Sequence, residues 1–310
     1  MPISRKHSSS QIPQPPQNQN PIGLKPGKGW HKRNPISEML LPAMLAKRRE
    51  KPPVEKLEAI PSGKIAITWL GHAAFLLRTA EHSVLIDPVW TKWLKIVKRL
   101  SSPVLTPRDL PKIDLVLITH AHFDHLDKRS LRKLPDMPPI VVPWHVGTVV
   151  SSLGFERIHE MHTWDTLRHG HLRVTLTPAR HWGARVLHDT HRGYGGFLVE
   201  YNDRCVFHCG DSSYFDGFVE IGERCRISAA LLPIGAYDTP SHRDVHMNPE
   251  EALQAFQDLR ADTMIPMHYG SFRLGYEPMD EPLHRLEACA THLGLRDRVH
   301  ALAEGATFIV

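Results

Sequence analysis

The chain has 310 residues, of which 41% are hydrophobic and 23% charged, a composition typical of a globular protein with one large domain or two smaller ones. We find no secretory signal and no apolar run long enough to span a membrane, which excludes an integral membrane protein and leads us to expect a cytoplasmic one. Residues 1–60 carry 11 Lys and Arg against 4 Asp and Glu, whereas the other residues carry 27 against 29, so the main body lacks the cationic excess of a nucleic-acid-binding protein.

The region before residue 64 differs in composition from the rest. Residues 1–30 are basic and rich in Pro, Gln, Asn and Ser, so they cannot bury enough apolar surface to fold, and we expect a disordered arm. Residues 31–63 form a predicted extension, in which residues 37–48 make a short helix whose Leu and Met side chains pack on the body. A role of this helix at a membrane surface is the alternative. The folded domain is predicted to cover residues 64–310.

Short strands and helices alternate through that domain. Apolar runs between turn residues predict strands at 65–70, 74–77, 83–86, 113–118, 140–142, 172–176, 196–201, 205–209, 229–232, 263–267 and 306–310. Helices are predicted at 127–134, 144–153, 249–259 and 281–293, the third opened by Asn248 as N-cap and Pro249 in its first turn. Two successive halves of strands and helices indicate an α/β protein with two sheets packed face to face and helices outside.

One segment of the chain concentrates metal-binding side chains. His120, His122, Asp124 and His125 lie within six positions, directly after the predicted strand 113–118. Imidazole and carboxylate groups bind a borderline divalent metal such as zinc. Their position after a buried strand is where an α/β protein usually builds its site. The spacing therefore predicts a metal centre rather than a histidine-rich surface loop.

Three further polar residues follow other predicted strands. His181 comes after strand 172–176, Asp211 after strand 205–209 and His268 after strand 263–267. A lone histidine at such a place is usually structural. Four strand ends with metal-binding side chains are better explained by one site built from several loops.

The order of these motifs resembles the metallo-β-lactamase superfamily, and in particular its branch of N-acyl-phosphatidylethanolamine-hydrolysing phospholipases D. The resemblance covers residues 64–310. The motifs that carry it, besides the metal-binding segment, are Trp69 to Ala73, Asp87-Pro88, Thr177-Pro178, His181-Trp182, Pro233 to Tyr237, Pro249 to Ala252 and His268 to Phe272. It implies an αβ/βα sandwich of two mixed sheets flanked by helices, with a two-metal site at one edge.

The resemblance also implies roles for individual residues. One zinc ion would be held by His120, His122 and His181, the other by Asp124, His125 and His268, with Asp211 bridging the two; Mn²⁺ or Fe²⁺ are alternatives to zinc. Asp211 and Asp124 would thereby be catalytic, Asp124 also by orienting a water molecule. His246 is a further catalytic candidate, since it could contact phosphate or protonate a leaving group. His72 and Asp87 are candidates for supporting the metal ligands by hydrogen bonds.

The implied activity is hydrolysis of N-acyl-phosphatidylethanolamine-like lipids to N-acylethanolamine and phosphatidic acid. The implied partner is a phospholipid or another phosphodiester, with peripheral membrane association and no nucleic acid. Two other activities of the same fold remain open, a lactonase and a phosphodiesterase for small molecules. A nuclease or a non-catalytic binding module is less favoured, because the body is not basic and the ligand set is complete. The sequence leaves the oligomeric state open, with a homodimer as one alternative.

Overall fold

The computed structural model describes residues 34–50, 56–186, 189, 191–238 and 245–310. The predicted disordered arm over residues 1–30 lies outside these ranges. Within them, no helix is both long and apolar enough to cross a lipid bilayer.

The first sheet has seven strands and is mixed. Its spatial order is β15 (Thr307–Ile309), β1 (Ala66–Gly71), β2 (Ala74–Arg78), β3 (Ser83–Ile86), β6 (Leu115–Leu117), β7 (Ile140–Pro143) and β8 (Ile158–Met161). The pairs from β15 to β3 are antiparallel, and those from β3 to β8 are parallel. The parallel half therefore brings the carboxyl ends of β3, β6 and β7 to the same edge.

The second sheet has six strands and is mixed in the same way. Its order is β14 (Thr263–Met267), β13 (Ala229–Pro233), β12 (Arg204–His208), β11 (Gly196–Tyr201), β10 (Leu172–Thr177) and β9 (Thr166–His169). The strands β12, β13 and β14 run parallel, and the remaining pairs are antiparallel. A separate two-stranded hairpin joins β4 (Trp93–Leu94) to β5 (Val97–Lys98).

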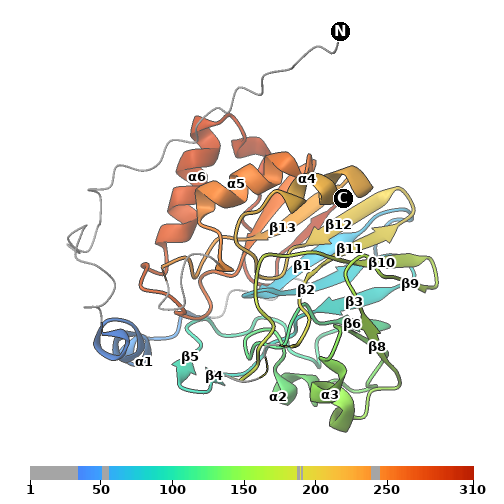
Figure 1. The fold of residues 1–310 in the computed structure, drawn as a ribbon, viewed down its shortest axis with the longest axis horizontal. Helices are drawn as coiled ribbons and strands as arrows, with labels where there is room; N and C mark the ends of the chain where they lie inside the picture. Colours follow the sequence, from blue (N-terminus) through green and yellow to red (C-terminus); the bar gives the residue numbers. More distant parts are fainter. Residues whose placement is uncertain (1–33, 51–55, 187–188, 190, 239–244) are drawn as a thin grey trace. The chain divides into compact units, whose positions relative to one another are not determined.

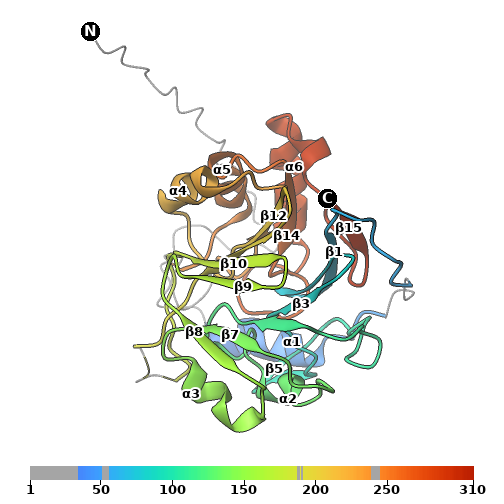
Figure 2. The ribbon, with the colours of Figure 1, turned by 90° about the vertical axis from the view of Figure 1, so that its right-hand side faces the viewer.

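The two sheets pack face to face, with helices on both outer sides (Figures 1 and 2). Phe75 and Leu117 of the first sheet share one buried cluster with Phe197 and Leu231 of the second. The helices α4 (Gly217–Arg224), α5 (Pro249–Asp258) and α6 (Glu281–His292) cover the second sheet, and α2 (Lys128–Leu131) and α3 (Gly147–Val150) cover the first. This layering confirms the predicted αβ/βα sandwich of two mixed sheets.

Several predicted elements differ in extent. The helix predicted at 144–153 begins only at Gly147, because His145 has a left-handed φ of 62°, and it ends in a 3₁₀ turn over Ser151–Leu153. A second 3₁₀ turn spans Arg296–Arg298. The strands β4, β5, β8 and β9 and the helix α4 were not predicted; the first four are only two to four residues long, too short for a periodic pattern.

The N-terminal helix also differs from its prediction. Instead of residues 37–48, a π-helical turn over Ile36–Leu40 continues into α1 (Leu41–Leu45). Met39 and Ala43 pack inward and are buried, but the side chains of Met44 and Leu45 are exposed. The expectation that the Leu and Met residues of this segment pack on the body is therefore only partly met, because a surface helix can bury only one of its faces.

The predicted N-cap of α5 is present, and its contribution to the stability of the protein can be tested. Asn248 accepts a hydrogen bond from the Glu251 backbone N–H at 2.8 Å, and the Glu251 side chain accepts one from the Asn248 N–H at 3.0 Å. Asn248→Ala should lower the free energy of unfolding by about 1 kcal/mol, because a buried helix end loses its acceptor. Chemical denaturation measures this. Asn248→Asp keeps the acceptor and should cost less than about 0.5 kcal/mol; equal losses in both variants would contradict the capping role.

Candidate metal centre

The segment after β6 carries four of the predicted site residues on one tight loop. His125 N–H donates to the His122 carbonyl at 3.2 Å, and Leu126 N–H donates to the same oxygen at 2.8 Å. This turn brings the side chains of the loop to one side instead of spreading them along the chain. The N-cap Asp127, whose carboxylate accepts from Ser130 N–H at 3.1 Å, then starts α2.

A first group of donors combines this loop with two ends of the second sheet. His120, His122, His181 and Asp211 each offer a ligand atom, and these atoms all lie within 4.8 Å of one another. His120 Nε2 is 2.9 Å and His181 Nε2 is 3.2 Å from His122 Nδ1. The three imidazoles thus point at a common centre.

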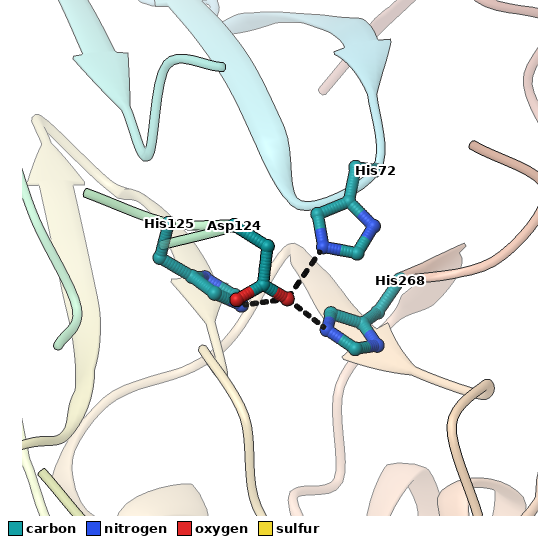
Figure 3. Close-up of side chains that lie close together, drawn as sticks. All are labelled: His72, Asp124, His125 and His268. Atoms are coloured by element: carbon teal, nitrogen blue, oxygen red, sulfur yellow. Dashed lines mark hydrogen bonds and ion pairs between the residues drawn. The ribbon is translucent and has the colours of Figure 1, made fainter. Parts of the chain in front are cut away.

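A second group lies beside the first and is drawn in Figure 3. Asp124 Oδ2 is 3.0 Å from His72 Nε2, 3.4 Å from His268 Nε2 and 3.6 Å from His125 Nε2. These four residues also offer ligand atoms within 4.8 Å of one another. His72, which the sequence analysis considered only as a supporting residue, therefore lies as close to this centre as the predicted ligands do.

Asp211 lies between the two groups. Its Oδ2 atom is 3.2 Å from both His125 Nε2 and His268 Nε2, and 3.8 Å and 3.9 Å from His120 Nε2 and His181 Nε2. One carboxylate oxygen thus faces imidazoles of both groups, which is the position that a bridging ligand requires. The structure brings together all seven residues that the sequence predicted as ligands.

Hydrogen bonds to the Nδ1 atoms of two imidazoles, on the side away from the metal centre, orient their rings. Asp87, at the end of β3, is fully buried and accepts from His125 Nδ1 at 2.7 Å, and it also accepts from the backbone and hydroxyl of Thr119. His181 Nδ1 donates to the Val245 carbonyl at 3.0 Å. Each bond leaves the Nε2 lone pair of its histidine turned toward the site, which is how metal-binding histidines are usually held. Thr119 was missed in the sequence analysis, although it directly precedes His120.

Three residues at the site have left-handed backbone conformations. The φ angles of His72, Asp87 and His268 are 56°, 43° and 61°. Such conformations cost side-chain-bearing residues about 1 kcal/mol or more each and tend to cluster at functional sites. They let each side chain turn sharply inward from the end of a strand.

The charges of the site are strongly coupled. Burial raises the pKa of the Asp211 carboxyl, but the His125 and His268 imidazoles outweigh it and hold that pKa well below its usual range. Burial in turn lowers the pKa of His268, yet Asp211 and Asp124 raise it to about 9. By contrast, burial and the neighbouring imidazoles lower the pKa of His120 well below its usual range. The carboxylates therefore stabilise positive charge at the centre of the site.

The donor set fits divalent metal ions. The Nε2 atoms of His122, His125 and His268 and the Oδ1 atom of Asp211 are buried and have no hydrogen-bond partner in the described part of the chain. Buried polar atoms without partners are rare because they cost free energy. Converging imidazoles and carboxylates of this kind are the ligands of zinc and of similar transition metals. No such fit is expected of a purely structural histidine cluster.

Other candidates lie at or near the site. His246 is buried and directs an unpartnered Nδ1 toward Asp211 Oδ2 at 3.9 Å. The Trp182 ring is 4.8 Å from the His122 ring and is partly exposed. Arg185, which was not predicted, donates to the Ala121 and Leu126 carbonyls and so braces the metal-binding loop.

The segment between Trp182 and Tyr194 holds further polar contacts. The His191 ring meets the His145 ring edge-on at 5.2 Å between centroids, and Arg192 pairs with Asp189 at 2.7 Å. His188 falls outside the described residues. Arg185, earlier in the same segment, contacts the metal-binding loop.

Comparisons with known proteins agree with this geometry. Residues 82–269, more than half of the chain, match the family described as the β-lactamase superfamily domain. The chain is 33% identical over 259 residues to the mitochondrial N-acyl-phosphatidylethanolamine-hydrolyzing phospholipase D of Saccharomyces cerevisiae, covering 77% of this chain and 55% of that protein. It is 32% identical over 252 residues to a metal-dependent hydrolase of Rubrobacter xylanophilus, covering 78% of this chain and 96% of that one.

A solved structure shows the same fold. The metallo hydrolase Igni18 of Ignicoccus hospitalis superposes with a TM-score of 0.61 at 26% identity, covering 80% of this chain and 98% of that one. Some relatives are longer than this chain, which spans 65% of the length of mycobacterial relatives and 55% of the yeast protein.

The two donor groups predict a metal content. Purified protein should carry about two equivalents of divalent metal, because each group supplies at least three ligand atoms. His181→Ala should lower this to about one, since His181 belongs only to the first group. His292→Ala, at the exposed end of α6, is the matched control and should keep both. Elemental analysis measures the content; an unchanged content in His181→Ala would contradict the grouping.

Proposed function

The chain is a metal-dependent hydrolase of the metallo-β-lactamase superfamily, and on that premise we propose that it is a di-zinc phosphodiesterase. Its proposed substrates are N-acyl-phosphatidylethanolamine-like lipids, which it would hydrolyse to N-acylethanolamine and phosphatidic acid. The observation that carries the proposal is the position of Asp211 between two complete donor groups. The lipid substrate is supported by the similarity to the yeast phospholipase D.

The proposed metal ligands follow from the two groups. His120, His122 and His181 would hold one ion, and Asp124, His125 and His268 the other, with Asp211 shared. Two divalent ions, when bound, supply Lewis acidity toward a phosphodiester oxygen and a nucleophilic water near neutral pH. The protein contributes a fixed, buried arrangement in which Asp87 and Val245 set the orientation of the imidazoles.

The two carboxylates have different environments and hence different roles. The Asp211 side chain is 2% exposed, whereas that of Asp124 is 15% exposed. Asp211 can therefore fix the separation of the ligand groups, while Asp124 is the carboxylate that solvent reaches. We assign Asp124 the second role of orienting a water molecule for attack on phosphorus.

His246 is proposed to act on the phosphate. Its side chain borders Asp211. Its ring stacks on the His268 ring at 5.4 Å between centroids and meets the His181 ring edge-on at 5.2 Å. It thus faces both donor groups from the side of the second sheet. From there its unpartnered Nδ1 can hydrogen-bond a phosphate oxygen or deliver a proton to the leaving group.

A shallow depression lies against His268. Its lining is mixed, with the apolar residues Phe272, Leu274 and Met279 beside the charged residues Arg273 and Glu277. A lipid chain requires apolar contacts beside the reacting group, whereas a sugar-phosphate lactone or a cyclic nucleotide requires polar and basic ones.

The substrate is tested with a panel. Release of N-acylethanolamine from N-acyl-phosphatidylethanolamine should exceed turnover of a lactone and of a cyclic nucleotide. Asp211→Asn should lower the rate by at least about a hundredfold, the scale for a lost catalytic group, whereas Asp203→Asn, an exposed aspartate, should not. Rapid turnover of the lactone or the cyclic nucleotide without any turnover of the lipid would contradict the proposed phospholipase activity. The assignment as a metal-dependent hydrolase would still hold.

The role of His246 is tested separately. His246→Gln should lower kcat by about a hundredfold, because a group acting on the phosphate or the leaving oxygen is lost, while the metal content stays unchanged. His292→Gln is the control. Steady-state kinetics combined with elemental analysis distinguishes this from a structural role. Unchanged kcat in the loaded variant would show that His246 takes no part in the reaction.

A further inference from the structure

Exposed apolar side chains are concentrated in two short segments of the chain. Among the described residues, eleven large hydrophobic side chains are exposed, and six of them come from two short segments, residues 36–45 and 93–96. We call these six side chains the apolar rim: Ile36, Leu41, Met44, Leu45, Trp93 and Ile96. Single exposed hydrophobic residues are normal on a protein surface, but such a concentration marks an interaction site.

The two segments are neighbours although about fifty positions separate them in sequence. Lys98 Nζ, on β5, donates to the carbonyls of Met44 and Ala46 at 3.0 Å and 2.6 Å, and Arg49 N–H donates to the Leu100 carbonyl at 2.7 Å. Both views show α1 beside the β4–β5 hairpin (Figures 1 and 2). The two segments that carry the apolar rim are therefore adjacent, and the helix is fixed by Met39 and Ala43, which pack inward.

The segments that carry the apolar rim are also rich in basic residues. The described residues 34–50 and 92–98 contain the cations Lys47, Arg48, Arg49, Lys92, Lys95 and Lys98, against the two carboxylates Glu38 and Glu50. Of these cations, Arg48 and Lys98 donate to backbone carbonyls and Lys95 lies over the Phe123 ring, but all six keep their positive charge. An apolar surface with an excess of positive charge in the same segments is complementary to the interface of a bilayer that contains anionic lipids. It is poorly suited to a second copy of the chain, because two such surfaces would place like charges opposite each other.

The inner side of the hairpin connects this surface to the metal centre. Leu94 packs with Val89 and Phe272 in a small buried cluster that Phe123 also contacts. Phe123 stands between His122 and Asp124 in sequence, and Lys95 Nζ lies 4.3 Å from its ring. The Phe272 ring in turn meets the His72 ring edge-on at 5.1 Å. The hairpin is thus exposed on one side and forms a wall of the site on the other.

We propose that the apolar rim docks on the surface of a bilayer that carries anionic lipids, with the metal centre next to the membrane. The inference rests on the proposed function, because a phospholipase must reach a substrate whose acyl chains stay in the bilayer. Docking through the hairpin would place the lipid headgroups beside the wall formed by Phe123 and Phe272. The apolar side chains would enter the interface, and the basic ones would lie at the headgroups.

Vesicle binding tests the proposal without using activity. The full-length, metal-loaded chain should co-sediment with vesicles of phosphatidylcholine and phosphatidylglycerol (about 7:3), and less with phosphatidylcholine alone, and the difference should shrink as NaCl is raised. The double variant Leu45→Ser, Ile96→Ser should bind at least about tenfold more weakly, since both side chains lose their apolar contact with lipid. Val219→Ser, on α4 at the far side of the molecule, is the matched control.

Each outcome decides the proposal. Loss of binding in the double variant, with the control unaffected and circular dichroism unchanged, supports it. Equal binding of all three proteins, or equal binding to neutral and anionic vesicles, overturns it. A wild-type dimer that becomes monomeric in the double variant, without vesicle binding, overturns it in favour of a second copy. If the protein binds the vesicles but does not hydrolyse the lipid, the proposed substrate is wrong, whereas the proposed docking surface is still supported.

Discussion

The buried carboxylate of Asp211 is the constraint on which the site depends. It lies close to imidazoles contributed by both sheets, and a buried anion is tolerated only where positive charge compensates it. The strand ends of the two sheets must therefore stay in register with each other to within a fraction of an ångström. The large core between the sheets, which contains Phe197 and Leu231, supplies that rigidity.

Rigid support also explains the irregular backbone at the site. His72, Asp87 and His268 keep left-handed conformations that cost free energy, and the surrounding hydrogen bonds hold them there. His72 N–H donates to the Ser271 hydroxyl, and His268 N–H donates to the His72 carbonyl. These hydrogen bonds connect the loops of the two sheets directly. A displacement of one strand end would therefore shift side chains of both donor groups.

The elements outside the sandwich differ in what they cover. Helices α4 to α6 bury the outer face of the second sheet, whereas α1 and the β4–β5 hairpin leave several apolar side chains exposed. The inner side of the hairpin packs Leu94 against Phe272, close to the metal centre. The docking that we propose would use the outer side of these two elements.

The sequence by itself was enough to predict the metal-binding side chains. These are the segment from His120 to His125 and the residues His181, Asp211 and His268. Each follows an apolar strand whose end can be recognised from the local pattern alone. The sequence also determined the layered fold, since long alternations of strand and helix carry that information. Only the tertiary structure decided that His72 joins the second donor group, because this contact joins loops of different sheets, whereas the place of Asp211 between the groups was already implied by the family resemblance. The tertiary structure alone decided that Leu41, Met44 and Leu45 are exposed while Met39 and Ala43 are buried, because sequence periodicity cannot tell which face of a short helix meets the rest of the protein.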